Sequence, residues 1–144
     1  PERCAMVARP ETDKKYFTRE QAEAMLPLVR SIVRDISDMA AKVRDRHERL
    51  SRLENGGVGR GLLTEAQLEE EQSAMEADTE RLRECVGELN GLGIEIKDLF
   101  TGLVDFPCWR DGREIYLCWK LDEAHLGWWH ETTAGFAGRK PLSQ

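Results

Sequence analysis

The chain has 144 residues, 33% of them charged and 40% hydrophobic, with a formal net charge of −6. This length and composition indicate one domain with a modest core, and the negative charge argues against non-specific binding to nucleic acid or an anionic membrane. No run of about 18 apolar residues is present, so no membrane-spanning helix is expected.

The first element that the pattern predicts is a long helix beginning at Thr18. Residues 1–15 are polar and irregular, so we expect a flexible arm before a single domain of residues 16–144. Thr18 and Gln21 have the spacing of a capping box, in which each side chain satisfies a backbone N–H of the other residue. Apolar residues then recur at steps of three and four, and the stop signal is the stretch Glu54-Asn55-Gly56-Gly57. Pro27 falls inside this stripe and predicts a kink or a late start.

A second helix is predicted after a flexible loop over residues 56–61. Thr64 and Gln67 repeat the capping-box spacing, and the helix ends near Gly91-Leu92-Gly93. Its apolar residues follow at intervals of seven: Leu68, Met75, Leu82 and Leu89. Because the loop is short, residues 18–92 are expected to form an antiparallel helical hairpin. Such a regular stripe is typical of an intramolecular core and also of the seam of a homodimer.

Over residues 100–142 the spacing of apolar residues is no longer helical, which predicts a β-rich tail. Asp111-Gly112 is a strong two-residue hairpin turn between β-like runs. Counting outward from that turn gives three apolar pairs on one face: Val104 with Trp119, Phe106 with Leu117, and Cys108 with Ile115. The other face then carries Asp105 opposite Cys118, and residues 126–131 are expected to add a third strand.

The mixed face of this hairpin contains ligand types that metals use. Asp105 and Cys118 meet there, and Glu123 and His130 lie close in sequence. A carboxylate, a thiolate and an imidazole suit zinc or iron, although these spacings fit no recognised metal motif. The alternative is structural, with the acid bonded to backbone amides and the cysteine and histidine buried in a core. A Cys118–His130 nucleophilic pair is a further alternative, which a neighbouring carboxylate disfavours because it raises a thiol pKa.

An anion site is also conceivable from the tail sequence. Trp119, Trp128 and Trp129 are candidates for an aromatic pocket wall, and Arg139 follows a loop rich in small residues. Backbone amides together with Arg139 suit a carboxylate or phosphate. The alternative is a closing loop whose arginine pairs with an acid such as Glu123 or Asp105.

The pattern of cysteines indicates the cellular compartment in which the protein is expected. Cys4, Cys85, Cys108 and Cys118 form no CxxC pair, which excludes the usual zinc-ribbon pattern. The start of the chain lacks the apolar run of a signal peptide. We therefore expect reduced thiols and a cytoplasmic location.

The motifs GLVDFP, LCW, WWHE and GFAGRKPL of the tail, with YFTREQAEAMLPLVR near the start, resemble the bacterial and archaeal family of unknown function catalogued as DUF2203. The resemblance implies small cytoplasmic proteins with a helical front and a motif-rich tail, and no established activity. Leu121-Asp122-Glu123 stands where the family has Leu-Gly-Glu. Motif matching points to these positions: Asp105, Arg113, Cys118, Trp119, Glu123, Trp129, His130 and Arg139.

Taken together, the sequence predicts an α+β fold, with a long antiparallel helical hairpin and a small three-stranded antiparallel β-meander. The first functional hypothesis is a metal site of Asp105, Cys118, Glu123 and His130. The same hypothesis includes a small anion bound by a further set of residues: Arg113, Trp119, Trp129 and Arg139. The second hypothesis is a helical oligomerisation or interaction module whose tail residues are structural. No nucleophile, base and oxyanion set can be assembled from spacing, so the sequence leaves enzyme activity open.

Overall fold

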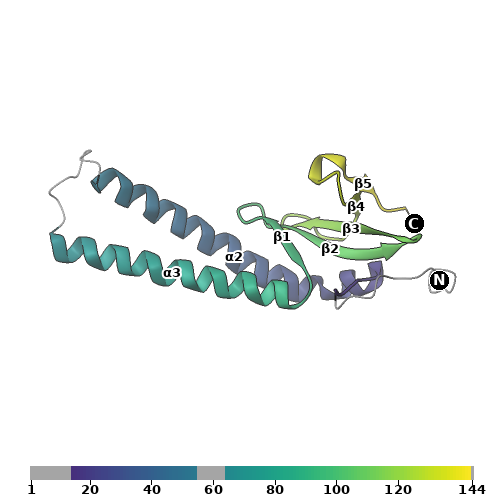
Figure 1. The fold of residues 1–144 in the computed structure, drawn as a ribbon, viewed down its shortest axis with the longest axis horizontal. Helices are drawn as coiled ribbons and strands as arrows, with labels where there is room; N and C mark the ends of the chain where they lie inside the picture. Colours follow the sequence, from purple (N-terminus) through teal and green to yellow (C-terminus); the bar gives the residue numbers. More distant parts are fainter. Residues whose placement is uncertain (1–13, 55–63, 144) are drawn as a thin grey trace.

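The computed structural model describes residues 14–54 and 64–143 and shows two long helices followed by one antiparallel sheet (Figure 1). The elements in chain order are α2 (Arg19–Glu54), α3 (Glu65–Gly91), β1 (Glu95–Asp98), β2 (Leu103–Arg110), β3 (Arg113–Lys120), β4 (Trp128–Glu131), the 3-10 turn η1 (Phe136–Gly138) and β5 (Lys140–Pro141). The predicted α+β class is confirmed. The expected arm lies outside the described residues except for positions 14 and 15, and the loop over 56–61 lies outside them altogether.

Both predicted capping boxes are present. The backbone N–H of Gln21 donates to Oγ1 of Thr18 at 3.0 Å, and the N–H of Thr18 donates to Oε1 of Gln21 at 2.9 Å. Thr64 and Gln67 form the same reciprocal pair at the start of α3. These side chains satisfy backbone donors that have no partner within the helix, which fixes where each helix begins.

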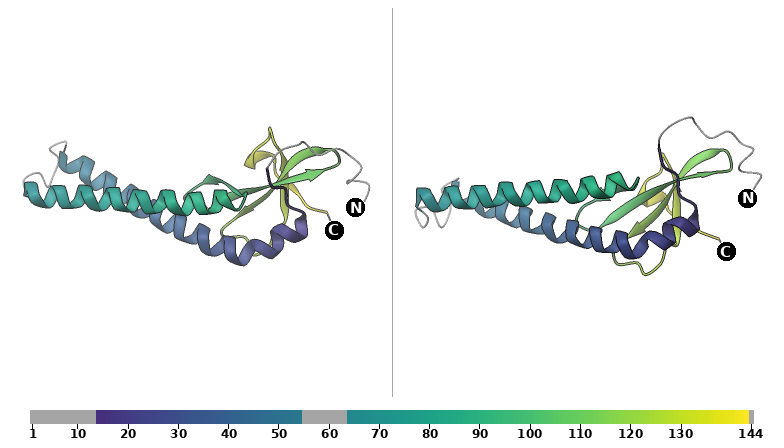
Figure 2. Two further views of the ribbon diagram at one scale, coloured as in Figure 1. Left: turned by 60° about the horizontal axis from the view of Figure 1, so that its bottom comes forward. Right: turned by 90° about the horizontal axis from the view of Figure 1, so that it is seen from below.

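The long helix α2 continues through Pro27 rather than starting after it. Figure 2 shows that its first turns run at an angle to the rest of the helix. A proline inside a helix removes one backbone hydrogen bond and bends the axis, so the kink is the outcome that the sequence predicts. The bend lets the first part of α2 follow the sheet while the remainder extends away beside α3 (Figures 1 and 2).

The sheet has the predicted hairpin register and two more strands than expected. Asp111 and Gly112 both have positive φ, 54° and 78°, which the tight turn requires. Around that turn every pair from Arg110 with Arg113 to Val104 with Trp119 is as counted from the sequence. Strand β4 is the expected third strand, shortened at its start, and β1 and β5 extend the meander to five strands in the order β1-β2-β3-β4-β5.

The β2–β3 hairpin has two faces, as alternation requires. The core face consists of Val104, Phe106, Cys108, Ile115, Leu117 and Trp119, all of them buried in the core that α2 helps to build. Helix α2 contributes a matching row to that core: Ala22, Leu26, Val29, Ile32, Val33 and Ile36. The outer face consists of Asp105, Pro107, Trp109, Glu114, Tyr116 and Cys118. It points away from α2 and carries the candidate site.

Candidate metal centre

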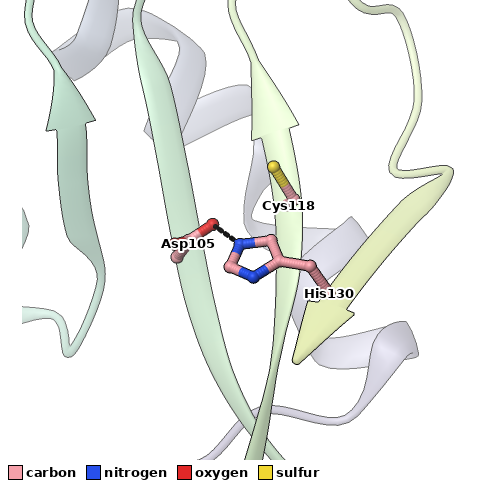
Figure 3. Close-up of side chains that lie close together, drawn as sticks. All are labelled: Asp105, Cys118 and His130. Atoms are coloured by element: carbon pink, nitrogen blue, oxygen red, sulfur yellow. Dashed lines mark hydrogen bonds and ion pairs between the residues drawn. The ribbon is translucent and has the colours of Figure 1, made fainter. Parts of the chain in front are cut away.

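Three neighbouring strands bring Asp105, Cys118 and His130 together on the outer face (Figure 3). Asp105 of β2 lies directly opposite Cys118 of β3, and His130 of β4 is one pair further along, opposite Tyr116. One ligand atom from each side chain lies within 4.8 Å of the other two. Within residues 14–54 and 64–143, no other group of three His, Cys, Asp or Glu side chains has this spacing.

These three side chains are buried, although they lie on the face opposite α2. Asp105 is 2% exposed, Cys118 0% and His130 2%. Burial of an acid and an imidazole is costly unless each has a partner. Here Nε2 of His130 lies 3.0 Å from Oδ1 of Asp105, and Nδ1 of His130 lies 2.7 Å from the carbonyl oxygen of Glu131.

The hydrogen bonds of His130 fix where its protons are. A carbonyl oxygen only accepts, so Nδ1 carries a hydrogen and donates it to Glu131. The other ring nitrogen, Nε2, lies 3.0 Å from Oδ1 of Asp105, the distance of a hydrogen bond. One proton is therefore shared between the imidazole and the carboxyl group.

The thiol of Cys118 is protonated in this environment. Burial, with the negative charge of Asp105 as the next contribution, raises the pKa of Cys118 to about 12. Burial likewise raises the pKa of Asp105, against the opposing effect of its hydrogen bond from His130. A reactive cysteine needs the reverse shift, and both ring nitrogens of His130 are already engaged with other partners. The arrangement therefore does not form a Cys–His nucleophilic pair.

The geometry is compatible with a tetrahedral metal once the ligand atoms adjust their separations. Metal–ligand bonds of about 2.0–2.3 Å place neighbouring ligand atoms roughly 3.3–3.7 Å apart. The three atoms of this group lie within 4.8 Å of one another, and the separation of 3.0 Å between Asp105 and His130 needs to widen slightly. The bond from Nδ1 to a backbone carbonyl is the outer contact that commonly orients a metal-binding histidine.

Tyr116 and Glu95 extend the outer face next to this group. The ring of Tyr116 lies 5.5 Å from that of His130, and its hydroxyl donates to the carboxylate of Glu95, 3.3 Å from the nearer oxygen. Glu95 is the β1 partner of Asp105 and also accepts from Lys97 at 2.8 Å. Sequence reasoning missed Glu95 because it did not predict β1, and without that partner Tyr116 was not singled out. The alternation of Glu95, Ile96 and Lys97 is the only local signal for that strand.

Glu123 is not part of the group. Its Oε1 accepts from a terminal nitrogen of Arg139 at 2.8 Å and from the backbone N–H of Lys120 at 3.0 Å. The guanidinium of Arg139 lies 4.7 Å from the ring centres of both Trp128 and Phe136. The expected alternative, in which this arginine pairs with Glu123, is confirmed.

The remaining candidates are distributed over the sheet. Trp119 is fully buried in the core and its indole N–H donates to the carbonyl of Glu123 at 2.9 Å. Trp129 is partly buried against the same core, with Lys140 5.1 Å from its ring. Arg113 donates two hydrogen bonds to the carboxylate of Glu131. The structure thus brings Arg113 and Trp129 to one end of the sheet, away from the Arg139–Glu123 pair.

Fold and site together define a small α+β protein whose antiparallel sheet carries a buried acid–thiol–imidazole group. The chain belongs to the DUF2203 family, because residues 15–142, nearly its whole length, match the model described as "Uncharacterized conserved protein (DUF2203)". No curated protein and no solved structure matches the chain. Among the helices of the described ranges, none has both the length and the apolar character needed to cross a membrane.

Proposed function

We propose that the protein binds a transition-metal ion, zinc or iron, through Asp105, Cys118 and His130. The observation that carries the proposal is the convergence of three buried ligand atoms within 4.8 Å, with the tautomer of His130 set so that Nε2 faces inward. A metal replaces the shared proton of the Asp105–His130 pair and the proton of the thiol. It thereby satisfies three polar groups that are otherwise buried around one point.

The ligand chemistry narrows the choice of metal. A thiolate is a soft ligand that Mg²⁺ and Ca²⁺ do not favour, whereas zinc and iron accept sulfur, nitrogen and oxygen together. Three protein ligands leave at least one coordination position for water or another molecule. Glu123 is held by Arg139 at 2.8 Å and does not fill that position in this arrangement.

Cobalt(II) provides a direct test because it replaces zinc and reports on sulfur ligation. Protein purified without an affinity tag is stripped with a chelator and titrated with Co²⁺ while the ultraviolet charge-transfer absorption of a cobalt–thiolate bond is followed. We expect this absorption in the wild type and in Cys85→Ser, a control that removes a partly buried thiol of α3. We expect it to be absent in Cys118→Ser and strongly weakened in His130→Gln.

Metal analysis of the untreated protein complements that titration. About one equivalent of zinc or iron in the wild type, and loss of that metal in Cys118→Ser, support the proposal. If wild-type protein and Cys118→Ser show the same metal content and the same cobalt spectrum, the three residues form a structural polar cluster and the proposal is wrong.

A further inference from the structure

A cavity of about 240 Å³ opens at the turn end of the β2–β3 hairpin. Its walls come from both sides of the turn and from the end of the described chain: Arg110, Arg113, Ile115, Trp129, Leu142 and Ser143. Trp129 and Ile115 belong to the side of the sheet that faces the core, so the cavity lies on the opposite side from Asp105, Cys118 and His130. It therefore has no part in the metal group.

Two guanidinium groups meet at this cavity. Arg110 and Arg113 are direct cross-strand partners, an arrangement of like charges that destabilises a sheet. Arg113 is neutralised by Glu131, with Nε–Oε1 at 3.1 Å and Nη2–Oε2 at 2.8 Å. For Arg110, no ion pair or hydrogen bond to another described residue is found, and it forms no salt bridge with Asp111, which also lines the cavity. Among the residues that the structure describes, this exposed arginine at the rim therefore has no counter-ion.

The remaining walls are mixed: Ile115, Trp129 and Leu142 are apolar, whereas Asp111 and Ser143 are polar. Ile115 is 2% exposed and Leu142 is 8% exposed, and the partly buried indole of Trp129 adds a flat surface. The volume equals that of roughly eight water molecules at about 30 Å³ each, so it admits a group no larger than about one ring. A cation at the rim beside the apolar side chains of Ile115, Trp129 and Leu142 is suited to a ligand with a carboxylate at one end and a flat hydrocarbon body at the other.

We infer that this cavity binds a small organic carboxylate, with the carboxylate on Arg110 and the apolar body against Trp129 and Ile115. The fork of donors on a guanidinium matches the two oxygens of a carboxylate. A cavity without such a cation does not favour a carboxylate over a neutral ligand. Glu131 holds the guanidinium of Arg113 in place through two hydrogen bonds. Binding at this site does not require metal.

Benzoate is the probe, and benzamide is its neutral counterpart of nearly the same shape. The readout is the indole N–H signal of Trp129 in a nitrogen–proton correlation spectrum, assigned by its loss in Trp129→Phe. We expect a saturable shift with benzoate and a much weaker response to benzamide or to acetate, which lacks the ring. Arg110→Gln is expected to weaken benzoate binding about tenfold, the effect of one charge-assisted hydrogen bond.

Two further variants make the test specific. Arg34→Gln removes an exposed arginine of α2 and should leave benzoate affinity unchanged. Arg110→Lys keeps the charge without the fork and should give an intermediate affinity. Equal shifts with benzamide and benzoate, no saturation with benzoate, or the same affinity in Arg110→Gln as in the wild type would each overturn the inference.

Discussion

The two faces of the β2–β3 hairpin belong to the same two strands and yet have opposite chemistry. The core face presents Phe106, Leu117 and Trp119 to α2, and these side chains are fully buried by apolar neighbours. The outer face presents Asp105 and Cys118, which are also buried but in contact with an imidazole and with each other. At these positions burial is therefore nearly equal on the two faces, and what differs is the kind of group that is buried.

This difference separates packing from chemistry. Removing an apolar group from water stabilises the fold in proportion to its area, so the core face contributes favourably without any partner of special type. A buried acid costs free energy unless a hydrogen bond, a proton or a metal compensates it. The outer group of Asp105, Cys118 and His130 is thus a place where the fold accepts a cost, and an ion that binds there recovers it.

The largest effect is expected on the core face. Phe106 is fully buried and its ring meets that of Phe17 edge-on, with centres 5.4 Å apart. Phe106→Ala should lower the free energy of unfolding by about 3–5 kcal/mol, through lost apolar burial and the cavity left behind. Urea denaturation followed by tryptophan fluorescence measures it. A loss below about 1 kcal/mol would show that this face is not the main source of stability.

The second prediction concerns the outer face and pH. Because the pKa of Cys118 is about 12, the thiol holds its proton throughout the neutral range and must release it to a metal. The shared proton of Asp105 and His130 is released as well. The apparent affinity for Zn²⁺ should therefore rise with pH, by at least about tenfold per pH unit, measured by competition with a chelator of known affinity. An affinity that does not change between mildly acidic and neutral pH would contradict thiolate ligation.

A smaller effect is expected from Asp105→Asn in metal-free protein. Burial raises the pKa of Asp105 above its ordinary 3.8, so the folded protein binds this proton more tightly than the unfolded chain does. Stability is then lost as pH rises from 3.8 through the folded pKa. The amide of the variant donates to Nε2 of His130 without a charge and avoids that loss. We expect a gain of about 1 kcal/mol at neutral pH, the size of one buried hydrogen bond.

The pH dependence of that gain is its control. It should shrink as the pH is lowered through 3.8, because below that pH wild-type Asp105 is protonated in both states. The same variant should bind Co²⁺ more weakly than the wild type. Equal stability at all pH values would mean that the buried carboxylate has no net cost. A variant that is less stable at neutral pH would mean that the carboxylate stabilises the fold.

The sequence predicted those parts of the molecule that local chemistry determines. The two capping boxes and the Asp111-Gly112 turn act over a few residues, so their spacing is visible in the chain. Once the turn is placed, strict alternation brings Asp105 opposite Cys118, and it does so without any tertiary information. His130 joined them because β4 continues the same meander, which is the simplest continuation of the hairpin.

The parts that sequence did not predict depend on distant partners. Strand β1 has only four residues, two of them acidic, and β5 has two residues including a proline, so neither is long enough to carry a clear strand pattern. The position of Glu123 is determined by Arg139 and by the backbone of Lys120, contacts that no spacing rule reveals. Closeness in sequence to His130 placed Glu123 in the predicted metal set, whereas the structure holds it in the Arg139 pair.

The smallest effect on stability, and the sharpest comparison of the two faces, comes from two cysteines. Cys108 lies on the core face and Cys118 on the outer face of the same hairpin, and both are buried. In metal-free protein, Cys108→Ala and Cys118→Ala should each change the free energy of unfolding by about 1 kcal/mol or less, since one sulfur is lost in each.

Added Zn²⁺ should distinguish these two variants. A ligand that binds only the folded state raises the melting temperature, so zinc should stabilise the wild type and Cys108→Ala alike. Cys118→Ala lacks the thiolate and should show little or no zinc-induced shift in a thermal melt. If both variants respond to zinc as the wild type does, sulfur is not a ligand, and the outer face is a hydrogen-bonded polar core. If only Cys118→Ala fails to respond, the two faces differ in function as well as in composition, because nearly identical losses of buried sulfur then have different consequences.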